Sequence, residues 1–142
     1  MPVIVDLDQA PKENFHDGGG KKIRIFDPAN HTRNVDVHIN IINPGQPAKG
    51  VIHYHKNIEN IYIILEGEGK IVDENGKEYK IKAGQAIFMK PGEPPDSHGI
   101  LNTGKVPLRL VEVYAPPQPR EAYDGGSFDA SKRDHITVKK ID

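Results

Sequence analysis

The sequence predicts an all-β domain, either a sandwich or a barrel, built from short strands. Fourteen glycines and twelve prolines divide its 142 residues into short segments, and no segment keeps a helical period over several turns. Roughly ten stretches with the character of strands follow one another at close spacing, which is typical of sandwiches and barrels. We therefore expect little helix and a sheet whose edges are removed by closure.

Length, charge and cysteine content restrict the class of protein further. A chain of this length holds one hydrophobic core, and its 19 basic and 20 acidic side chains leave a net charge of −1. Such a charge excludes a broad basic field for nucleic acid. No apolar run is long enough for a membrane span, and the first ten residues do not resemble a secretory signal. We expect a cytoplasmic protein without nucleic-acid or membrane partners. Because cysteine is absent, a metal site would use histidine and oxygen ligands.

Glycine, proline and asparagine turns separate the expected strands. Asn75-Gly76 is the strongest short hairpin signal, and Pro91-Gly92 begins a rigid corner. The expected strands cover residues 3–7, 22–26, 35–42, 60–65, 70–73, 78–81, 86–89, 97–102, 108–114 and 135–138, with His53-Tyr54-His55 on a further strand before residue 60.

These strands fall into three regions. We expect residues 1–34 to pack on the barrel as strands and loops, residues 35–115 to form the barrel, and residues 116–142 to form a C-terminal arm. The arm begins with the stiff segment Pro116-Pro117-Gln118-Pro119. Its strand either joins the chain's own sheet or crosses to a neighbouring subunit.

The strand over residues 35–42 alternates apolar and polar side chains. Its odd positions are expected to face the core, and its even positions Asp36, His38 and Asn40 the opposite face. Water, a subunit contact and a pocket wall all suit such a face, and water is the commonest of these environments. We therefore expect His38 to lie outside the metal site.

Two histidines one residue apart mark the stretch on which a metal site is expected. His53 and His55 point the same way if their segment is extended, because side chains alternate faces along a strand. Glu59 and Asn60 follow closely, and His98 comes after a proline-glycine corner. Two or three imidazoles with an oxygen donor suit one divalent transition metal, namely Fe, Mn, Ni, Cu or Zn.

The two motifs together resemble those of the cupin family. The family's first motif is glycine, His-x-His, three or four residues, glutamate, six residues and glycine. Its first glycine is not matched at the family spacing, where Pro47 stands, and lies at Gly45 or Gly50 instead. The family's second motif is glycine, five residues, Pro-x-Gly, two residues, histidine, three residues and asparagine. The matching residues here are His53-Tyr54-His55, Gly67, Gly84, Pro91-Gly92, His98 and Asn102. Lys90 replaces the second motif's first proline, and its corner holds three extra residues. The resemblance implies a double-stranded β-helix, or jelly-roll, barrel over residues 35–115.

The two ends of the first motif disagree about its fourth ligand. Counting forward from His55 leads to Glu59, whereas counting back from Gly67 leads to Asn60. A shift of one residue reverses the face that a strand residue occupies. A regular strand places Asn60 inside, and a bulge at residues 58–60 would turn Glu59 inward instead.

A regular strand also has a consequence for the outer surface. If Asn60 points inward, an apolar trio faces outward, made of Ile61, Ile63 and Leu65. Such a surface requires cover by a second sheet or by a partner subunit. We expect a homodimer.

The choice of fourth donor sets the charge of the site. The resemblance implies that His53, His55 and His98 hold the metal, with Glu59 or Asn60 as the further donor. Three neutral imidazoles and a carboxylate leave a divalent ion at net +1, whereas a carboxamide leaves +2. The +2 site acidifies bound water more strongly and favours an anionic substrate.

Strand parity also indicates pocket walls. Tyr62, Phe88 and Tyr114 are candidate substrate-binding residues, although interior aromatics also fill barrel cores. Glu112 and Tyr62 are candidate catalytic residues. An inward Glu112 near a metal would suit a general base, and an outward Glu112 would be a solvated charge.

The resemblance implies a small metalloenzyme of the dioxygenase, isomerase or lyase type, acting on a small oxygen-bearing molecule, anionic ones included. The fold does not choose among these reactions. The alternative is a non-catalytic module that binds a small, sugar-like ligand and keeps a structural metal.

Overall fold

A computed structural model describes residues 1–15, 19–45, 50–119, 122 and 132–141. The regular structure of these residues is almost entirely β, as expected, with one short 3-10 helix at a corner. The elements are β1 (Lys12–Phe15), β2 (Gly20–Phe26), β3 (Asp36–Ile42), β4 (Gly50–Tyr54), β5 (Glu59–Glu66), β6 (Glu68–Val72), β7 (Glu78–Lys82), β8 (Ala86–Met89), η2 (Pro94–Asp96), β9 (Gly99–Asn102), β10 (Leu108–Ala115) and β11 (Ile136–Ile141). In the same part of the chain, no helix is long and apolar enough to cross a membrane.

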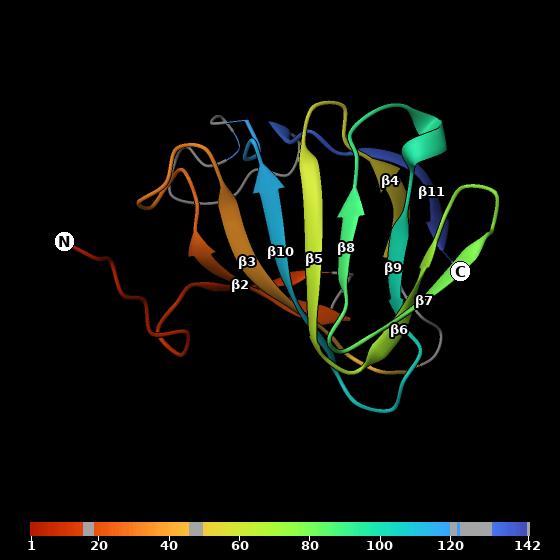
Figure 1. The fold of residues 1–142 in the computed structure, drawn as a ribbon, viewed down its shortest axis with the longest axis horizontal. Coiled ribbons are helices and arrows are strands. Elements are labelled where there is room, and N and C mark those ends of the chain that lie inside the picture. Colours follow the sequence, from red (N-terminus) through yellow and green to blue (C-terminus); the bar gives the residue numbers. More distant parts are fainter. Residues whose placement is uncertain (16–18, 46–49, 120–121, 123–131, 142) are drawn as a thin grey trace.

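The strands form two facing layers of a double-stranded β-helix. One layer is a six-stranded sheet in the order β1-β2-β3-β10-β5-β8, seen side by side from β2 to β8 in Figure 1. The other combines the three-stranded sheet β7-β6-β9 with the pair β11-β4. A two-way backbone contact between His53 and His98 joins β4 to the start of β9. Every strand pairing is antiparallel, which suits a jelly roll.

The expected closure of the sheet is wrong. In the described part of the chain, β8 pairs only with β5 and β7 pairs only with β6, so the hydrogen-bonded ladder is interrupted between β8 and β7. The layers are held together by their side chains instead. One apolar cluster draws residues from both layers: Ile42, Tyr62, Ile64, Ile71, Ile81, Ile100, Leu108 and Leu110.

Strand register arranges the interior of the large sheet in polar and apolar levels. At one end Asn60, Tyr114 and Asp36 lie side by side, and the next level holds Tyr62, Glu112 and His38. Leu110 and Ile64 begin the apolar end. One end of the interior is therefore suited to chemistry, and the other to stability.

The expectation that the even face of β3 meets water is wrong. Asp36, His38 and Asn40 are all buried, with His38 at 0% exposure. They face the space between the sheets, where Glu112 of β10 accepts from His38 and Asn40, and Asp36 contacts His38. Of the odd positions, Ile39 packs against the N-terminal segment on the outer side of the same sheet. Both faces of β3 are covered, and alternation alone cannot show that.

The N-terminal region also differs from expectation. Residues 3–7 form no strand; Val5 and Leu7 instead pack on the apolar cluster around Ile23 and Ile39. The strand β1 lies further along the chain and pairs with β2. At the other end, β11 pairs with β4 of the same chain. Residues 120–121 and 123–131 of the expected arm lie outside the described residues.

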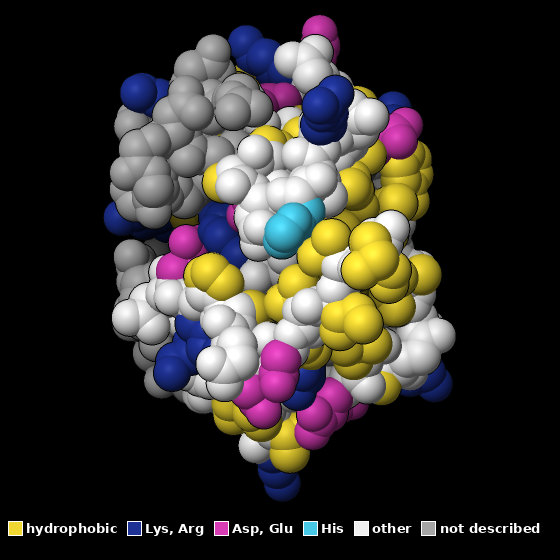
Figure 2. Space-filling view, turned by 90° about the vertical axis from the view of Figure 1, so that its left-hand side faces the viewer, with side chains coloured by type: hydrophobic (Ala, Val, Ile, Leu, Met, Phe, Trp, Pro, Cys, Tyr) yellow, Lys and Arg dark blue, Asp and Glu magenta, His cyan; other side chains and the backbone are white. Residues whose placement is uncertain are grey.

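The outer face of β5 and β8 carries exposed apolar side chains. Ile63, Leu65 and Phe88 are 42%, 48% and 58% exposed, and Phe88 pairs with Ile61 across the two strands. Figure 2 shows hydrophobic side chains gathered over part of the molecular surface on the N-terminal side.

Candidate metal centre

Three histidines meet between the two layers. His53 lies in β4, His55 directly after it, and His98 directly before β9. The His53 N–H donates to His98 O at 2.9 Å, and the His98 N–H donates to His53 O at 2.8 Å. This pairing brings the distant His98 against the His-x-His segment. One potential ligand atom from each of the three lies within 4.8 Å of the others.

The second ring nitrogen of each histidine faces a backbone carbonyl. Nδ1 of His53 lies 3.4 Å from Val51 O, and Nδ1 of His98 lies 3.3 Å from Asp96 O. Nδ1 of His55 contacts Asp134 O. Because a carbonyl only accepts, each Nδ1 carries the proton and each Nε2 offers a lone pair. This arrangement is typical of metal-ligating histidines.

Two of these lone pairs lack a partner. The Nε2 atoms of His55 and His98 are buried and have no hydrogen-bond partner among the described residues. A buried polar atom without a partner is costly. A divalent cation among the three rings would satisfy both nitrogens, so the donor set fits a metal of the kind expected from the sequence.

Burial keeps the imidazoles neutral. It lowers the pKa of His53 well below its usual value, and neighbouring histidines lower that pKa further. Burial likewise lowers the pKa of His55, and lowers that of His98 to about 4. Neutral rings at pH 7 need not release a proton before they bind a metal.

The register question is answered by burial. Glu59 is exposed at the start of β5, whereas Asn60 is 1% exposed. The ladder between β5 and β10 is regular here, with Ala115 opposite Glu59 and Tyr114 opposite Asn60. No bulge turns Glu59 inward. Asn60 donates from Nδ2 to Glu112 Oε2 at 3.0 Å, and its carbonyl oxygen is buried without a described partner.

Glu112 points inward, the first of the two orientations that the sequence left open. Its carboxylate accepts from His38 Nε2 at 2.6 Å, from Asn40 Nδ2 at 2.8 Å and from the Tyr114 hydroxyl at 3.3 Å, besides the bond from Asn60. Burial opposes ionisation, but hydrogen bonding and charge from His38, with the nearby Lys22, outweigh it and hold the pKa of Glu112 well below its usual value. Nδ1 of His38 faces Asp36 Oδ1 at 2.8 Å.

Of the three candidate substrate-binding residues, two lie in the interior and the third lies on the outer face of the sheet. Tyr62 and Tyr114 are buried, and their ring centroids lie 6.3 Å from His98 and 5.4 Å from His55, respectively. Burial, with Glu112 nearby, raises the pKa of Tyr62 well above its usual value, so its hydroxyl keeps its proton. Phe88 lies on the opposite face of the sheet from these tyrosines.

A cavity leads from the open side of the sandwich to His98. It has a volume of about 750 Å³ and is lined by β6, β7, β8 and the segment before β9. Ile81, Ile87 and Met89 supply apolar wall, and Phe88 and Tyr79, both exposed, also line it. The interruption between β8 and β7 therefore leaves room for a small molecule beside one of the three histidines.

The sequence did not single out His135. Its ring stacks on His53 with centroids 4.0 Å apart and planes at 15°. Burial lowers the pKa of His135 to about 3, with Arg133 the next cause. The predicted strand over residues 135–138 began at this residue, but nothing in one sequence links that strand to β4.

A double-stranded β-helix with a histidine cluster between its layers defines a cupin-like protein. The comparison with protein families agrees: residues 39–114 match the cupin domain family Cupin_2. The chain belongs to the cupin family.

Two curated relatives resemble parts of the chain. An uncharacterized protein of Methanocaldococcus jannaschii is 38% identical over 74 residues, which are 52% of this chain and 56% of that protein. The oxalate-binding protein of Thermotoga maritima is 44% identical over 62 residues, or 44% of this chain and 48% of that protein. The chain thus spans about half the length of the curated relatives it matches.

Among solved structures, a predicted oxalate decarboxylase from Thermotoga maritima is 30% identical, with a TM-score of 0.65. The match covers 80% of this chain and 99% of that one.

Proposed function

We propose that the protein is a metal-dependent cupin enzyme that acts on a small oxygen-bearing molecule. His53, His55 and His98 hold one divalent transition metal, which is Fe, Mn, Ni, Cu or Zn. The observation that supports this proposal most directly is that the Nε2 atoms of His55 and His98 are buried without a described partner, within a cluster of neutral imidazoles. The bound metal supplies a Lewis acid that polarises an oxygen of the substrate.

The charge of the site favours an anionic substrate. Asn60, which is neutral, occupies the inward position where the family's motif has its glutamate. Three imidazoles and a carboxamide leave a divalent ion at net +2. The buried carboxylate of Glu112 is already engaged by His38 and by two asparagines. A small carboxylate fits this charge, and the names of two similar proteins, an oxalate-binding protein and a predicted oxalate decarboxylase, support the same class.

The hydrogen bonds suggest separate roles for the interior polar residues. Both oxygens of Glu112 accept from protein donors, so we assign it to orienting Asn60 and Asn40. These two side chains donate their amide hydrogens to Glu112 and keep their carbonyl oxygens free of described partners. Tyr62, whose protonated hydroxyl also reaches Glu112, is the candidate donor to a substrate oxygen. The cavity beside His98 is the candidate substrate pocket.

A non-catalytic binding module is the second candidate. One curated relative is named for binding oxalate rather than for converting it. In that case the same cavity would hold a small ligand without turnover, and the metal would serve structure or binding.

A panel assay separates the two candidates. Protein purified without added metal is analysed for its elements and then loaded with each of Mn, Fe, Ni, Cu and Zn. Each form is mixed with oxalate, malonate, glycolate and a set of simple sugars, while binding heat, oxygen consumption and CO₂ release are followed. Turnover of a carboxylate supports the enzyme. Tight binding of one member without turnover supports the binding module, and neither binding nor turnover in any form contradicts both.

A further inference from the structure

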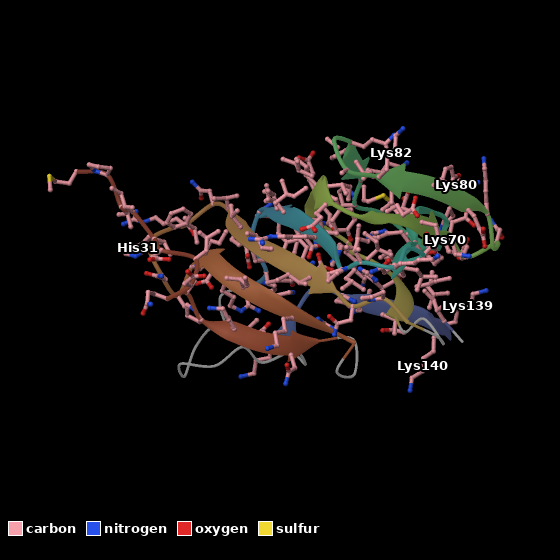
Figure 3. All side chains as sticks on the ribbon, turned by 90° about the horizontal axis from the view of Figure 1, so that it is seen from below. His31, Lys70, Lys80, Lys82, Lys139 and Lys140 are labelled. Carbon is pink, nitrogen blue, oxygen red and sulfur yellow. The ribbon has the colours of Figure 1, made fainter. Side chains whose placement is uncertain are left out.

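The C-terminal strand covers the strand that carries the metal-site histidines. β11 pairs with β4 in antiparallel register, with Thr137 opposite His53 and Ile136 opposite Tyr54. Lys140 of β11 extends outward from the molecule (Figure 3), and Lys139 donates to Glu74 O at 3.2 Å. The segment that enters β11, residues 134–135, lies directly against the histidines.

Asp134 holds the turn that follows His55. Its main-chain oxygen contacts Nδ1 of His55. Its carboxylate oxygens accept from the backbone N–H groups of Lys56 and Asn57, both at 2.9 Å. One residue, far away in sequence, thus sets both the ring orientation of His55 and the path of the chain beyond it.

Gln118 holds Asp134 in turn. Its side-chain oxygen accepts from the Asp134 N–H at 2.6 Å, and its side-chain nitrogen lies 3.4 Å from Asp134 O as a donor. Gln118 is only 3% exposed, so water competes little for these bonds. The two bonds engage both backbone polar groups of one residue of the arm, Asp134.

His135 completes the contact on the other ring. It stacks on His53 with planes at 15°, and its edge approaches His55 with ring centroids 5.7 Å apart. Stacking on one face of His53 limits the rotation of that imidazole. The two histidines of the His-x-His segment therefore each have an orienting partner from the arm.

We propose that Gln118, Asp134 and His135, named here the arm clamp, are positioning residues of the metal centre. They hold His53 and His55 in the orientation in which Nε2 faces the metal. Metal affinity then depends on the docking of β11 on β4. This inference rests on the proposed metal site and adds a dependence on a segment outside the residues that match the cupin family model.

Metal binding and the docking of β11 on β4 should each strengthen the other. Partners in the outer shell of a metal site typically change metal affinity about 10- to 100-fold when removed. Because linkage between two equilibria is reciprocal, a metal that binds better when β11 is docked also holds β11 in place. The clamp therefore makes two measurable predictions, one about the metal and one about the strand.

The first measurement is the affinity for Zn²⁺ of the full chain, from competition with a chromophoric chelator at pH 7. Asp134→Ala removes the two bonds to the turn after His55, and we expect about a 10-fold weaker Kd. Asp73→Ala is the matched control. The Asp73 carboxylate also accepts from two backbone N–H groups, those of Asn75 and Lys77, in the turn between β6 and β7. The control should keep the Kd of the wild type. Gln118→Ala, which removes bonds to Asp134 rather than to a histidine, should weaken Zn²⁺ binding in the same direction as Asp134→Ala.

The second measurement is amide hydrogen exchange of residues 136–141 with and without Zn²⁺. Zn²⁺ should slow exchange there in the wild type and have a smaller effect in Gln118→Ala. Wild-type Zn²⁺ affinity in both clamp variants, or no effect of Zn²⁺ on exchange in β11, would overturn the clamp while leaving the metal site standing. Absence of Zn²⁺ binding by the wild type would overturn the metal site and the clamp together.

Discussion

At the scale of single residues, the interior is organised around one carboxylate. Glu112 accepts hydrogen bonds from β3, β5 and its own strand, and His38 links it to Asp36. Buried charges are tolerated only when they are paired and hydrogen-bonded. The network therefore holds Asn60 and the two inward tyrosines in fixed positions around the histidines.

Glu112→Gln tests this network. Loss of a paired buried charge should lower the free energy of unfolding by about 3 kcal/mol at pH 7. The pKa of Glu112 is lower in the folded protein than its value of about 4.5 in the unfolded chain. The ionised carboxylate therefore stabilises the fold fully above pH 4.5. That stabilisation is lost as the pH falls through the pKa of the folded state. Urea unfolding at pH 7 and pH 3.5 should therefore show a smaller gap between variant and wild type at the lower pH. Glu59→Gln, at an exposed position of β5, is the control. A difference in free energy of unfolding between Glu112→Gln and the wild type that does not change with pH would contradict the assigned charge state.

The sequence was informative about residues that belong to a motif. Strand parity predicted that His53 and His55 lie together, and the spacing from His98 to Asn102 in the second motif singled out His98. Counting from Gly67 placed Asn60 inside, as the structure has it. His38 was misjudged because its carboxylate partner Glu112 is 74 residues away, and a polar face that meets a buried carboxylate looks the same in sequence as one that meets water.

At the scale of elements, close packing between strands depends on small residues. Gly69 of β6 faces β9 and β10, where an added Cβ would lie 2.3 Å from Leu101 O and 2.9 Å from Leu108 Cδ2. The backbone oxygen cannot move without disturbing the ladder between β6 and β9.

Gly69→Ala should therefore cost about 3 kcal/mol of stability, in the range of overpacked cores, as measured by urea unfolding at pH 7. Gly104→Ala is a useful comparison, because its added Cβ meets chiefly the flexible side chain of Glu68 at 3.1 Å. The comparison variant should stay within about 0.5 kcal/mol of the wild type. Equal stability of the two variants would contradict the packing described for β6.

A further prediction at the scale of elements concerns the exposed face of β5 and β8. Ile63, Leu65 and Phe88 form an apolar surface, and we expect a second copy of the chain to cover it. Ile63→Glu should then shift the protein from dimer to monomer in light scattering after gel filtration, with little change in melting temperature. Val138→Glu, at an exposed position of β11, should leave the dimer intact. A wild type that stays monomeric at high concentration would contradict the expected dimer.

Elements were predictable where turn residues bound them and less so at the chain ends. The strands between Asp36 and Ala115 follow the expected order, because glycine, proline and asparagine turns separate them. Residues 3–7 have strand-like composition but form no strand, and their Val5 and Leu7 pack on the apolar cluster of Ile23 and Ile39. The pairing of β11 with β4 joins segments about 80 residues apart, and no local pattern specifies such a contact.

At the scale of the whole molecule, the apolar cluster and the histidines share one interior, and Tyr62 contributes to both. The apolar cluster of both layers includes Leu108, Leu110 and Ile64, whereas the histidines lie beside Tyr62 and Tyr114. We therefore expect the metal-free protein to stay folded, because the apolar cluster does not depend on the metal.

The most direct test of the metal centre is a Zn²⁺ titration of metal-free wild type, His98→Ala and His31→Asn, followed by calorimetry. His31 is exposed and lies in a turn near the N-terminal side (Figure 3), and asparagine tolerates its positive φ of 74°. The wild type and His31→Asn should each bind about one Zn²⁺ per chain, as one three-histidine site requires, whereas His98→Ala should bind it at least 10-fold more weakly. Equal Zn²⁺ affinity in all three proteins would remove His98 from the ligand set and contradict the three-histidine centre.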